Sequence, residues 1–113
     1  MNCVFCKIAE KSLPAEIVFE DEHFVAFNDI HPKGPHHVLI VPKIHVASIK
    51  ELDEEGEKMT GKMIGLARKI ARERGMEAYK LVLNVGRDAG QTVDHLHLHC
   101  VGGWGEAPGE VEI

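Results

Sequence analysis

The sequence has 113 residues, of which 44% are hydrophobic and 27% are charged. These proportions are typical of a globular domain and exclude a collagen-like or disordered chain, and the length fits one domain. Thirteen Lys and Arg against 18 Asp and Glu give a formal net charge of −5, which argues against a nucleic-acid partner. Eight residues are histidine, the side chain whose pKa lies nearest neutrality and the commonest metal ligand.

The first residues, 1–7, contain no apolar run followed by a small-residue cleavage site, and no segment reaches the length of a membrane span. We therefore expect a cytoplasmic protein with no membrane partner. The three cysteines, Cys3, Cys6 and Cys100, are odd in number, which argues against the disulfide framework of a secreted protein. We expect one domain over residues 1–103 and a Gly- and Glu-rich tail over residues 104–113.

The first half of the chain predicts three strands. Short apolar runs at 17–19 and 24–27, separated by four polar residues, predict a β-hairpin. Residues 29–35 are dense in turn-forming residues and predict a loop. Residues 37–41 are apolar after an initial histidine and predict a third strand.

The second half predicts two helices and two further strands. Ser48 and Glu51 have the spacing of a capping box, which predicts a short helical turn. Apolar residues at intervals of three and four predict the main helix over 53–74. The last two strands are predicted over 81–85 and 95–101. Several strands joined by short connections, together with one principal helix, indicate an α+β domain with a largely antiparallel sheet.

The last predicted strand carries three histidines on one face, because side chains two residues apart on a strand point the same way. The Cα atoms of neighbouring histidines are then about 6.6 Å apart, and those of the outer pair about 13 Å apart. Zinc–nitrogen bonds are only about 2.0–2.1 Å long, so one ion cannot easily bind His95, His97 and His99 together. We expect the three imidazoles to have different roles. A solvated histidine stripe is the alternative, but the intervening residues are apolar and require a core.

The polar loop over 86–92 lies immediately before these histidines. It offers backbone N–H groups, the Gln91 amide and the Thr92 hydroxyl to an anion. It is not a Walker A loop, because no Gly-Lys-Ser/Thr follows. Its position beside three imidazoles indicates a phosphate site.

The pair Cys3-x-x-Cys6 has the spacing of half a zinc site. A redox role is disfavoured, because such a pair should follow a strand at a helix start and only two residues precede Cys3. The other ligands would have to be histidines, with His45 and one member of the 95–99 group as candidates. Two reduced cysteines without a metal are the alternative.

The segment 95–101 resembles the His-x-His-x-His-x-x signature of the histidine-triad family. Other motifs resemble the Hint branch of that family in the same order along the chain: residues 5–8, 13–15, 18–21, 26–30, 42–45 and 90–93. The resemblance covers residues 3–103. It stops at the tail, since Hint proteins usually place a Trp-Pro pair near the C-terminus, whereas Trp104 here follows Gly102-Gly103 directly.

The resemblance implies a five-stranded antiparallel sheet with one long and one short helix, and a homodimer in which two sheets join into one of ten strands. It implies hydrolysis or transfer at the α-phosphate of a purine nucleoside phosphoramidate. Two alternatives stay open: a dinucleoside polyphosphate hydrolase of the Fhit type, and a zinc-stabilised nucleotide-binding module without significant catalysis.

The resemblance also implies catalytic roles. His97 would attack phosphorus and form a nucleotidyl-histidine, and His99 would donate a proton to the leaving group. His37 would orient the nucleophile or relay protons to it. A structural zinc ion, not required for the chemistry, would be bound by Cys3, Cys6, His45 and His95.

The same resemblance assigns residues to substrate binding. Asp29 would bind the ribose hydroxyls, with a turn-forming role as the alternative. Phosphate oxygens would be held by Asn84, Gln91 and Thr92. The base would lie in an apolar slot, with plain core packing as the alternative, formed by Phe5, Ile8, Phe27 and Ile30.

Overall fold

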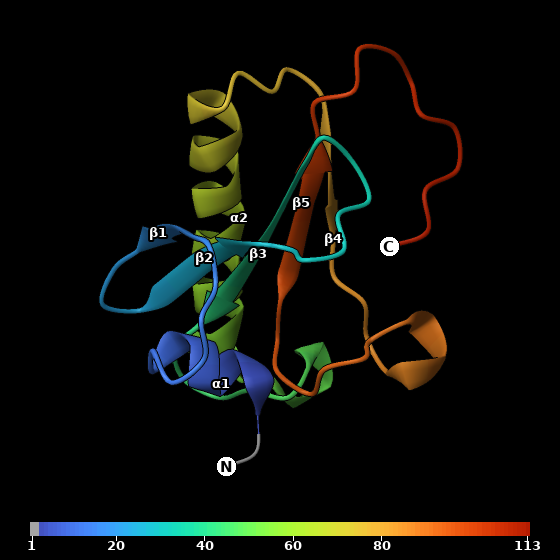
Figure 1. The fold of residues 1–113 in the computed structure, drawn as a ribbon. Coiled ribbons are helices and arrows are strands. Elements are labelled where there is room, and N and C mark those ends of the chain that lie inside the picture. The colour runs from blue at the N-terminus through green and yellow to red at the C-terminus, as the bar shows by residue number, and fades with distance from the viewer. Residues whose placement is uncertain (1–2) are drawn as a thin grey trace.

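The computed structural model describes residues 3–113 and contains one antiparallel sheet in the order β1-β2-β3-β5-β4 (Figure 1). The strands are β1 (Ile17–Glu20), β2 (Phe24–Asn28), β3 (His36–Pro42), β4 (Tyr79–Val82) and β5 (Leu98–Gly102). The predicted α+β fold with a five-stranded antiparallel sheet is confirmed. β3 and β5 lie side by side at the centre, and both carry histidines that belong to the site.

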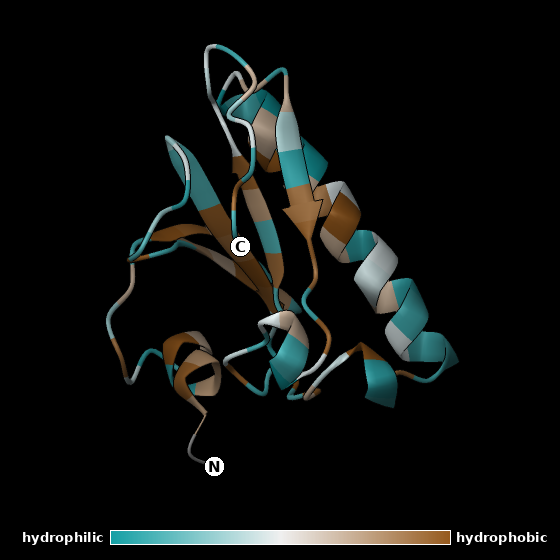
Figure 2. Cartoon of the chain, turned by 90° about the vertical axis from the view of Figure 1, so that its right-hand side faces the viewer, coloured by the Kyte–Doolittle hydropathy of each residue, from teal (hydrophilic) through white to brown (hydrophobic). Residues whose placement is uncertain are grey.

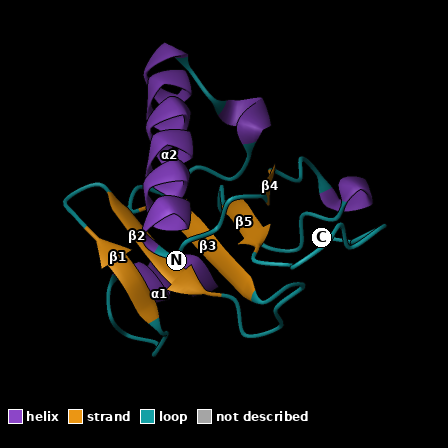
Figure 3. Cartoon of the chain, turned by 90° about the horizontal axis from the view of Figure 1, so that it is seen from above, coloured by secondary structure: helices purple, strands orange, loops and turns teal. Residues whose placement is uncertain are grey.

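The long helix α2 (Glu54–Glu73) and the short helix α1 (Val4–Ala9) lie on opposite sides of the sheet (Figure 3). The carboxylate of Asp53 caps α2 by accepting a hydrogen bond from the Gly56 N–H at 2.8 Å. Gly75 follows the end of α2 with φ +70°, a conformation that favours glycine. Figure 2 shows the hydrophilic residues of α2 on its solvent-facing side. None of the helices in residues 3–113 combines the length and the apolar character needed to cross a membrane.

Alternation along the strands divides the interior into two cores. Val38 and Ile40 of β3 pack with α2 in the larger core, whereas Leu39 and Val41 pack with α1 in the smaller one. In β5, Cys100 belongs to the α2 side and is fully buried, as expected for a small apolar residue. The catalytic candidates therefore lie on the α1 side of the sheet, away from the long helix.

Several element boundaries differ from those predicted. The fourth strand spans Tyr79–Val82 instead of 81–85, because the chain turns away before Gly86, whose φ is +87°. The fifth strand begins at Leu98. The 48–51 turn is a 3₁₀ helix, η1 (Ile49–Glu51); a second 3₁₀ turn is η2 (Arg87–Ala89).

The short α-helix lies instead at residues 4–9, where no helix was predicted. Cys3 is its N-cap, and the Cys3 sulfur accepts a hydrogen bond from the Cys6 N–H at 3.3 Å. The cysteine pair does therefore lie at a helix start, although no strand precedes it within the described residues.

Candidate active site and metal centre

Four buried histidines gather on the α1 face of the sheet: His37, His95, His97 and His99. The ring centroids of His97 and His99 are 5.1 Å apart, as are those of His37 and His99. Only His99 of the triad lies within a strand. The chain before β5 is tied down by the Leu96 N–H, which donates to the Val46 carbonyl at 2.6 Å. The triad residues still share one face, as predicted, and the three rings have different partners.

His97 presents a free lone pair. Its Nδ1 lies 2.7 Å from the carbonyl oxygen of His95. Because a carbonyl can only accept, Nδ1 must carry the proton and Nε2 holds the lone pair. Burial lowers the pKa of His97, partly offset by that hydrogen bond, so the ring is neutral at pH 7. A neutral imidazole with an available Nε2 is the form that can act as a nucleophile.

His37 and His99 form a directed pair. The backbone N–H of Lys33 donates to Nδ1 of His37 at 3.0 Å, so the proton of neutral His37 lies on Nε2. That Nε2 is 2.9 Å from Nδ1 of His99 and 3.5 Å from Oδ2 of Asp29. The Nδ1 atom of His99 is thus an acceptor, and the proton of neutral His99 lies on Nε2. His37, which was expected to orient His97 or to relay protons to it, therefore hydrogen-bonds His99 instead.

Burial dominates the electrostatics of this pair. It lowers the pKa of His99 to about 4, with further lowering from His97 and His37 and an opposing contribution from Asp29. Burial also lowers the pKa of His37, again opposed by Asp29. Both rings are neutral at pH 7 in the ligand-free protein. A bound anion would raise these pKa values by favouring the charged form.

A separate cluster, Cys3, Cys6, His45 and His95, brings its four ligand atoms within 4.8 Å of one another, close enough to hold one metal ion. Nδ1 of His95 lies 3.3 Å from the Cys3 sulfur, 3.4 Å from the Cys6 sulfur and 3.2 Å from Nδ1 of His45. The Cys6 sulfur is 3.3 Å from Nδ1 of His45. Ligand atoms bound to one tetrahedral zinc ion at ordinary bond lengths lie roughly 3.3–3.8 Å apart. The donor set, two sulfurs and two imidazole nitrogens, suits zinc.

The protonation of His95 also fits a metal. Its Nε2 donates to the Pro42 carbonyl at 2.8 Å, so the Nδ1 lone pair points into the cluster. Burial and the neighbouring Cys3 raise the pKa of Cys6 to about 11, and a divalent cation would reverse that effect by favouring the thiolate. The four predicted zinc ligands are therefore brought together.

The second group of possible ligands, Asp29, His37 and His99, does not suit a metal. A metal on Nε2 of His37 would need the ring proton on Nδ1, where the Lys33 N–H already donates. This group is instead arranged to conduct or hold a proton.

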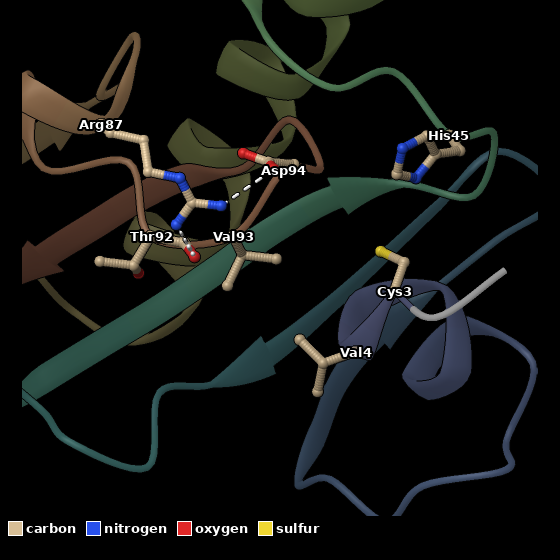
Figure 4. Close-up of a pocket in the computed structure, with 7 residues that line it drawn as sticks. All are labelled: Cys3, Val4, His45, Arg87, Thr92, Val93 and Asp94. Atoms are coloured by element: carbon tan, nitrogen blue, oxygen red, sulfur yellow. Dashed lines mark hydrogen bonds and ion pairs between the residues drawn. The ribbon is translucent and has the colours of Figure 1, made fainter.

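A cavity of about 420 Å³ opens beside the metal centre (Figure 4). Cys3, Val4 and His45 lie on one side of it, and the polar loop lies on the other. On the loop side, Arg87 pairs with Asp94 at 2.9 Å. The cavity is thus bounded by the metal cluster and by the loop predicted to bind phosphate.

Comparison with known proteins decides the family. Residues 2–111 match the family model described as scavenger mRNA decapping enzyme C-term binding. The purine nucleoside phosphoramidase of Escherichia coli K12 is 39% identical over 102 residues, which cover 88% of this chain and 86% of that protein. The chain belongs to the histidine-triad family.

Two solved structures of histidine-triad proteins resemble this one closely. A hydrolase of the family from Legionella pneumophila has a TM-score of 0.90 and 41% identity, covering 96% of this chain and 98% of its own. A zinc-bound member from Mycobacterium smegmatis has a TM-score of 0.84 and 33% identity, and the match covers 96% of this chain and 79% of that protein.

The residues that the histidine-triad resemblance assigned to the base fall into two groups. Phe5, Ile8 and Phe27 are buried in the smaller core, and Phe5 contacts both Phe27 and His97 edge to face, at centroid distances of 5.5 and 5.1 Å. Ile30 is 84% exposed. Both core packing and a base-facing edge are compatible with the first three, whereas Ile30 has no packing role in the folded chain.

The polar residues of the predicted substrate site differ in how free their side chains are to bind a ligand. Asp29 Oδ1 accepts the His31 N–H at 2.8 Å, which forms the turn considered as its alternative role. Gln91 is buried; its amide oxygen accepts from the Gly86 N–H, and its amide nitrogen donates to the carbonyls of Ala47 and Val93. Asn84 donates to the carbonyls of Gly90 and Ile113. The side chain of Thr92 lines the cavity.

Sequence reasoning missed three groups that organise the site: the Lys33 N–H and the carbonyls of Pro42 and His95. All three are backbone atoms, so residue type carries no direct signal for them. The sequence pointed to these groups only indirectly, through the turn-rich loop before β3 and through Pro42, the last residue of β3.

Proposed function

We propose that this histidine-triad protein is a hydrolase or nucleotidyl transferase that acts at the α-phosphate of purine nucleoside phosphoramidates. The observation that carries the proposal is the hydrogen bond from Nδ1 of His97 to the His95 carbonyl, which leaves a neutral nucleophile at Nε2. The name of the Escherichia coli relative supports the substrate class.

The reaction would proceed in two balanced steps. In the first, Nε2 of His97 forms a bond to phosphorus as the phosphorus–nitrogen bond to the leaving amine breaks, and the amine takes the Nε2 proton of His99. In the second, water attacks phosphorus and gives a proton to His99, while the bond between phosphorus and His97 breaks. The products are an amine and a nucleoside monophosphate.

His99 must be charged before the first step, although it is neutral in the ligand-free protein. The anionic phosphate of the substrate would raise the pKa of His99 at the moment of binding. The proton gained would enter at Nδ1 of His99, and the Nε2–H of His37 would then turn from that atom to Oδ2 of Asp29, which lies 3.5 Å away. His37 would orient His99 rather than His97.

Substrate binding would place the phosphate at the loop side of the cavity, which Thr92 lines, and the base beyond the residues that line this cavity. Ile30 would cover one face of the base and the edge of Phe5 the other, with Phe27 and Ile8 as the floor. The free oxygen of Asp29 would accept a ribose hydroxyl. Phosphate oxygens would be bound by Asn84 and Thr92; because its amide is fully engaged, Gln91 would act by fixing the loop.

We further propose that Cys3, Cys6, His45 and His95 bind a structural zinc ion. Four protein ligands leave no open position for substrate, which is typical of structural sites. The ion would fasten α1 to the chain before β5, next to the backbone carbonyl that orients His97. The zinc-bound Mycobacterium smegmatis relative supports the choice of metal.

The proposed assembly is a homodimer formed through β4, which lies at the outer edge of the described sheet. Leu81 of β4 and Ile64 of α2 are large apolar side chains left exposed, at 37% and 46%. Leu81 shares the α2 side of the sheet with Tyr79 by alternation, yet α2 does not cover it. Pairing of two β4 edges would extend the sheet to ten strands and cover these residues.

The test is mass spectrometry of the enzyme quenched in acid-free denaturant during turnover of adenosine 5′-monophosphoramidate. We expect a mass increase of one adenylyl group, mapped to His97, and loss of both the adduct and turnover in His97→Ala. His23→Ala, an exposed position, is the matched control and should retain activity. Turnover without an adduct, or an active His97→Ala variant, would overturn the mechanism. Faster turnover of a diadenosine polyphosphate would overturn the substrate class.

A further inference from the structure

Trp104 lies just after β5, and its indole lies directly on the loop before β3. A Cβ atom placed on Gly34 would be 2.7 Å from Cζ2 and 3.0 Å from Cε2 of Trp104, and 2.9 Å from Cγ1 of Val101. Distances this short cannot be accommodated without movement. Gly34 is therefore enclosed between the indole and the side chain of a β5 residue.

A second contact joins the same two segments. Gly103 has φ +89°, and a Cβ on it would lie 2.6 Å from Cδ2 of His36. His36 is held in turn by Arg74, whose guanidinium lies 3.2 Å from its Nδ1. Two consecutive residues after β5 thus pack against the end of the loop that leads into β3. β5 carries both His99 and this contact.

The loop that Trp104 covers is the one that sets the proton positions. Its ends are joined by the Asp29 N–H, which donates to the His37 carbonyl at 2.9 Å. Lys33, adjacent to Gly34, supplies the N–H that donates to Nδ1 of His37. A displacement of Gly34 therefore acts on the backbone of the adjacent residue, which carries this N–H.

We propose that Trp104 is a positioning residue: by seating its indole on Gly34 it keeps the Lys33 N–H on Nδ1 of His37, so that the catalytic proton resides on His99. With Nδ1 occupied as an acceptor, His37 cannot take a second proton without expelling the Lys33 N–H. The proton gained when substrate binds then goes to Nδ1 of His99, the ring that faces the leaving group in the proposed reaction, because the Nε2–H of His37 can turn to the Asp29 carboxylate 3.5 Å away. The proposal rests on the proposed function for this last step alone.

The first test reads the imidazole nitrogens of the ligand-free protein by long-range ¹⁵N–¹H spectroscopy. In the wild type, Nδ1 of His37 and of His99 should both show the shift of an unprotonated nitrogen. In Trp104→Ala, we expect both signals to move toward averaged values, while those of His97 remain unchanged because the His95 carbonyl holds it. Trp104→Phe should restore the wild-type pattern, and Glu110→Gln, an exposed tail substitution, should not alter it.

The second test compares two leaving groups. General acid catalysis is worth 10²–10⁴-fold, and partial misdirection of the proton should cost about 10-fold in kcat for an amine leaving group. The p-nitrophenyl ester of adenosine monophosphate releases a phenolate that needs no proton, so its kcat should fall by less than about 2-fold in Trp104→Ala. A purely structural role would reduce both rates equally.

Gly34→Ala provides an independent variant should Trp104→Ala fail to fold, since the added methyl displaces the indole from the other side. It should give the same nitrogen shifts. Unchanged His37 and His99 signals in a folded variant, or equal changes at His97, would overturn the proposal. If the wild type turned over neither substrate, the proposed function would fail, while the nitrogen spectra would still decide the role of Trp104.

Discussion

The backbone carbonyl of Pro42 accepts a hydrogen bond from Nε2 of His95 at 2.8 Å. This bond fixes the tautomer of His95 and directs its Nδ1 lone pair at Cys3 and Cys6. It also connects the end of β3 to the residue whose own carbonyl orients His97. The proposed metal site and the proposed nucleophile are thus linked through the backbone of one residue, His95.

Removal of zinc should therefore lower stability much more than catalysis. For free zinc at several hundred times its Kd, Cys6→Ser or chelation should lower the free energy of unfolding by about 3–4 kcal/mol. The specific activity of the protein that remains folded should fall by less than about 3-fold, because His97 keeps its hydrogen bond to the chain. Chemical denaturation, metal content and initial rates measure the three quantities.

Cys100→Ala is the matched control for this prediction, because Cys100 is a buried thiol remote from the metal cluster. It should retain one zinc per chain. A folded, chelated protein without activity would contradict the structural assignment, as would full zinc occupancy in Cys6→Ser.

The low pKa of His99 predicts a loss of stability in mild acid. His99 has an ordinary pKa of 6.5 when unfolded and about 4 when folded, so the unfolded chain binds more protons between these values. The contribution of His99 to the free energy of unfolding is complete above pH 6.5 and is lost as the pH falls toward 4. The shift corresponds to about 3 kcal/mol in total. His99→Gln should flatten this part of the pH–stability curve.

The comparison is made between variant and wild type at each pH, so that acid release of metal affects both alike. His23→Gln, at a side chain that is 69% exposed, should keep the wild-type slope. Parallel curves for His99→Gln and the wild type between pH 6.5 and 4 would show that His99 is not buried as a neutral ring.

Sequence patterns predicted the sheet because alternation and apolar periodicity are local properties. The spacing of the three histidines predicted that they share one face, and residue type suggested Cys3, Cys6 and His45 as metal ligands. His95 as the fourth ligand came from the resemblance to the histidine-triad family. The short helix α1 escaped prediction because its six residues carry no full amphipathic repeat. His37 was expected to act on His97, whereas its partner in the structure is His99. The difference comes from the register between β3 and β5, which places Leu39 opposite His99. Such a long-range pairing is not encoded in the local patterns of a single sequence.

Protonation states were the least predictable feature of the site. They depend on the backbone groups of Lys33, Pro42 and His95, whose directions follow from loop geometry rather than from side-chain identity. The contact of Trp104 with Gly34 was equally unpredictable, since the sequence indicates only that both residues lie outside regular elements.

The exposed apolar residues at the β4 edge predict a dimer that a single charge disrupts. Leu81→Lys should convert the dimer into a monomer, because a lysine would have to be buried without a partner. Light scattering at micromolar concentration measures the mass. Ile44→Lys, at an exposed apolar residue outside β4, should leave the dimer intact. A wild-type protein that is monomeric under these conditions would contradict the proposed assembly.

Among the residues proposed to bind the base, substitutions should affect either substrate affinity or stability, depending on whether the side chain is exposed or buried. Ile30 is exposed, so Ile30→Ala should change the free energy of unfolding by less than about 0.5 kcal/mol. Loss of its contact with the base should raise KM by about 10-fold, which corresponds to about 1.4 kcal/mol of apolar contact. Phe27→Ala should instead cost about 3–5 kcal/mol of stability, because the ring is buried in the smaller core. Denaturation curves and steady-state kinetics on the same preparations separate the two effects, with Ile44→Ala as the exposed control. An unchanged KM in Ile30→Ala would show that the base does not bind against Ile30.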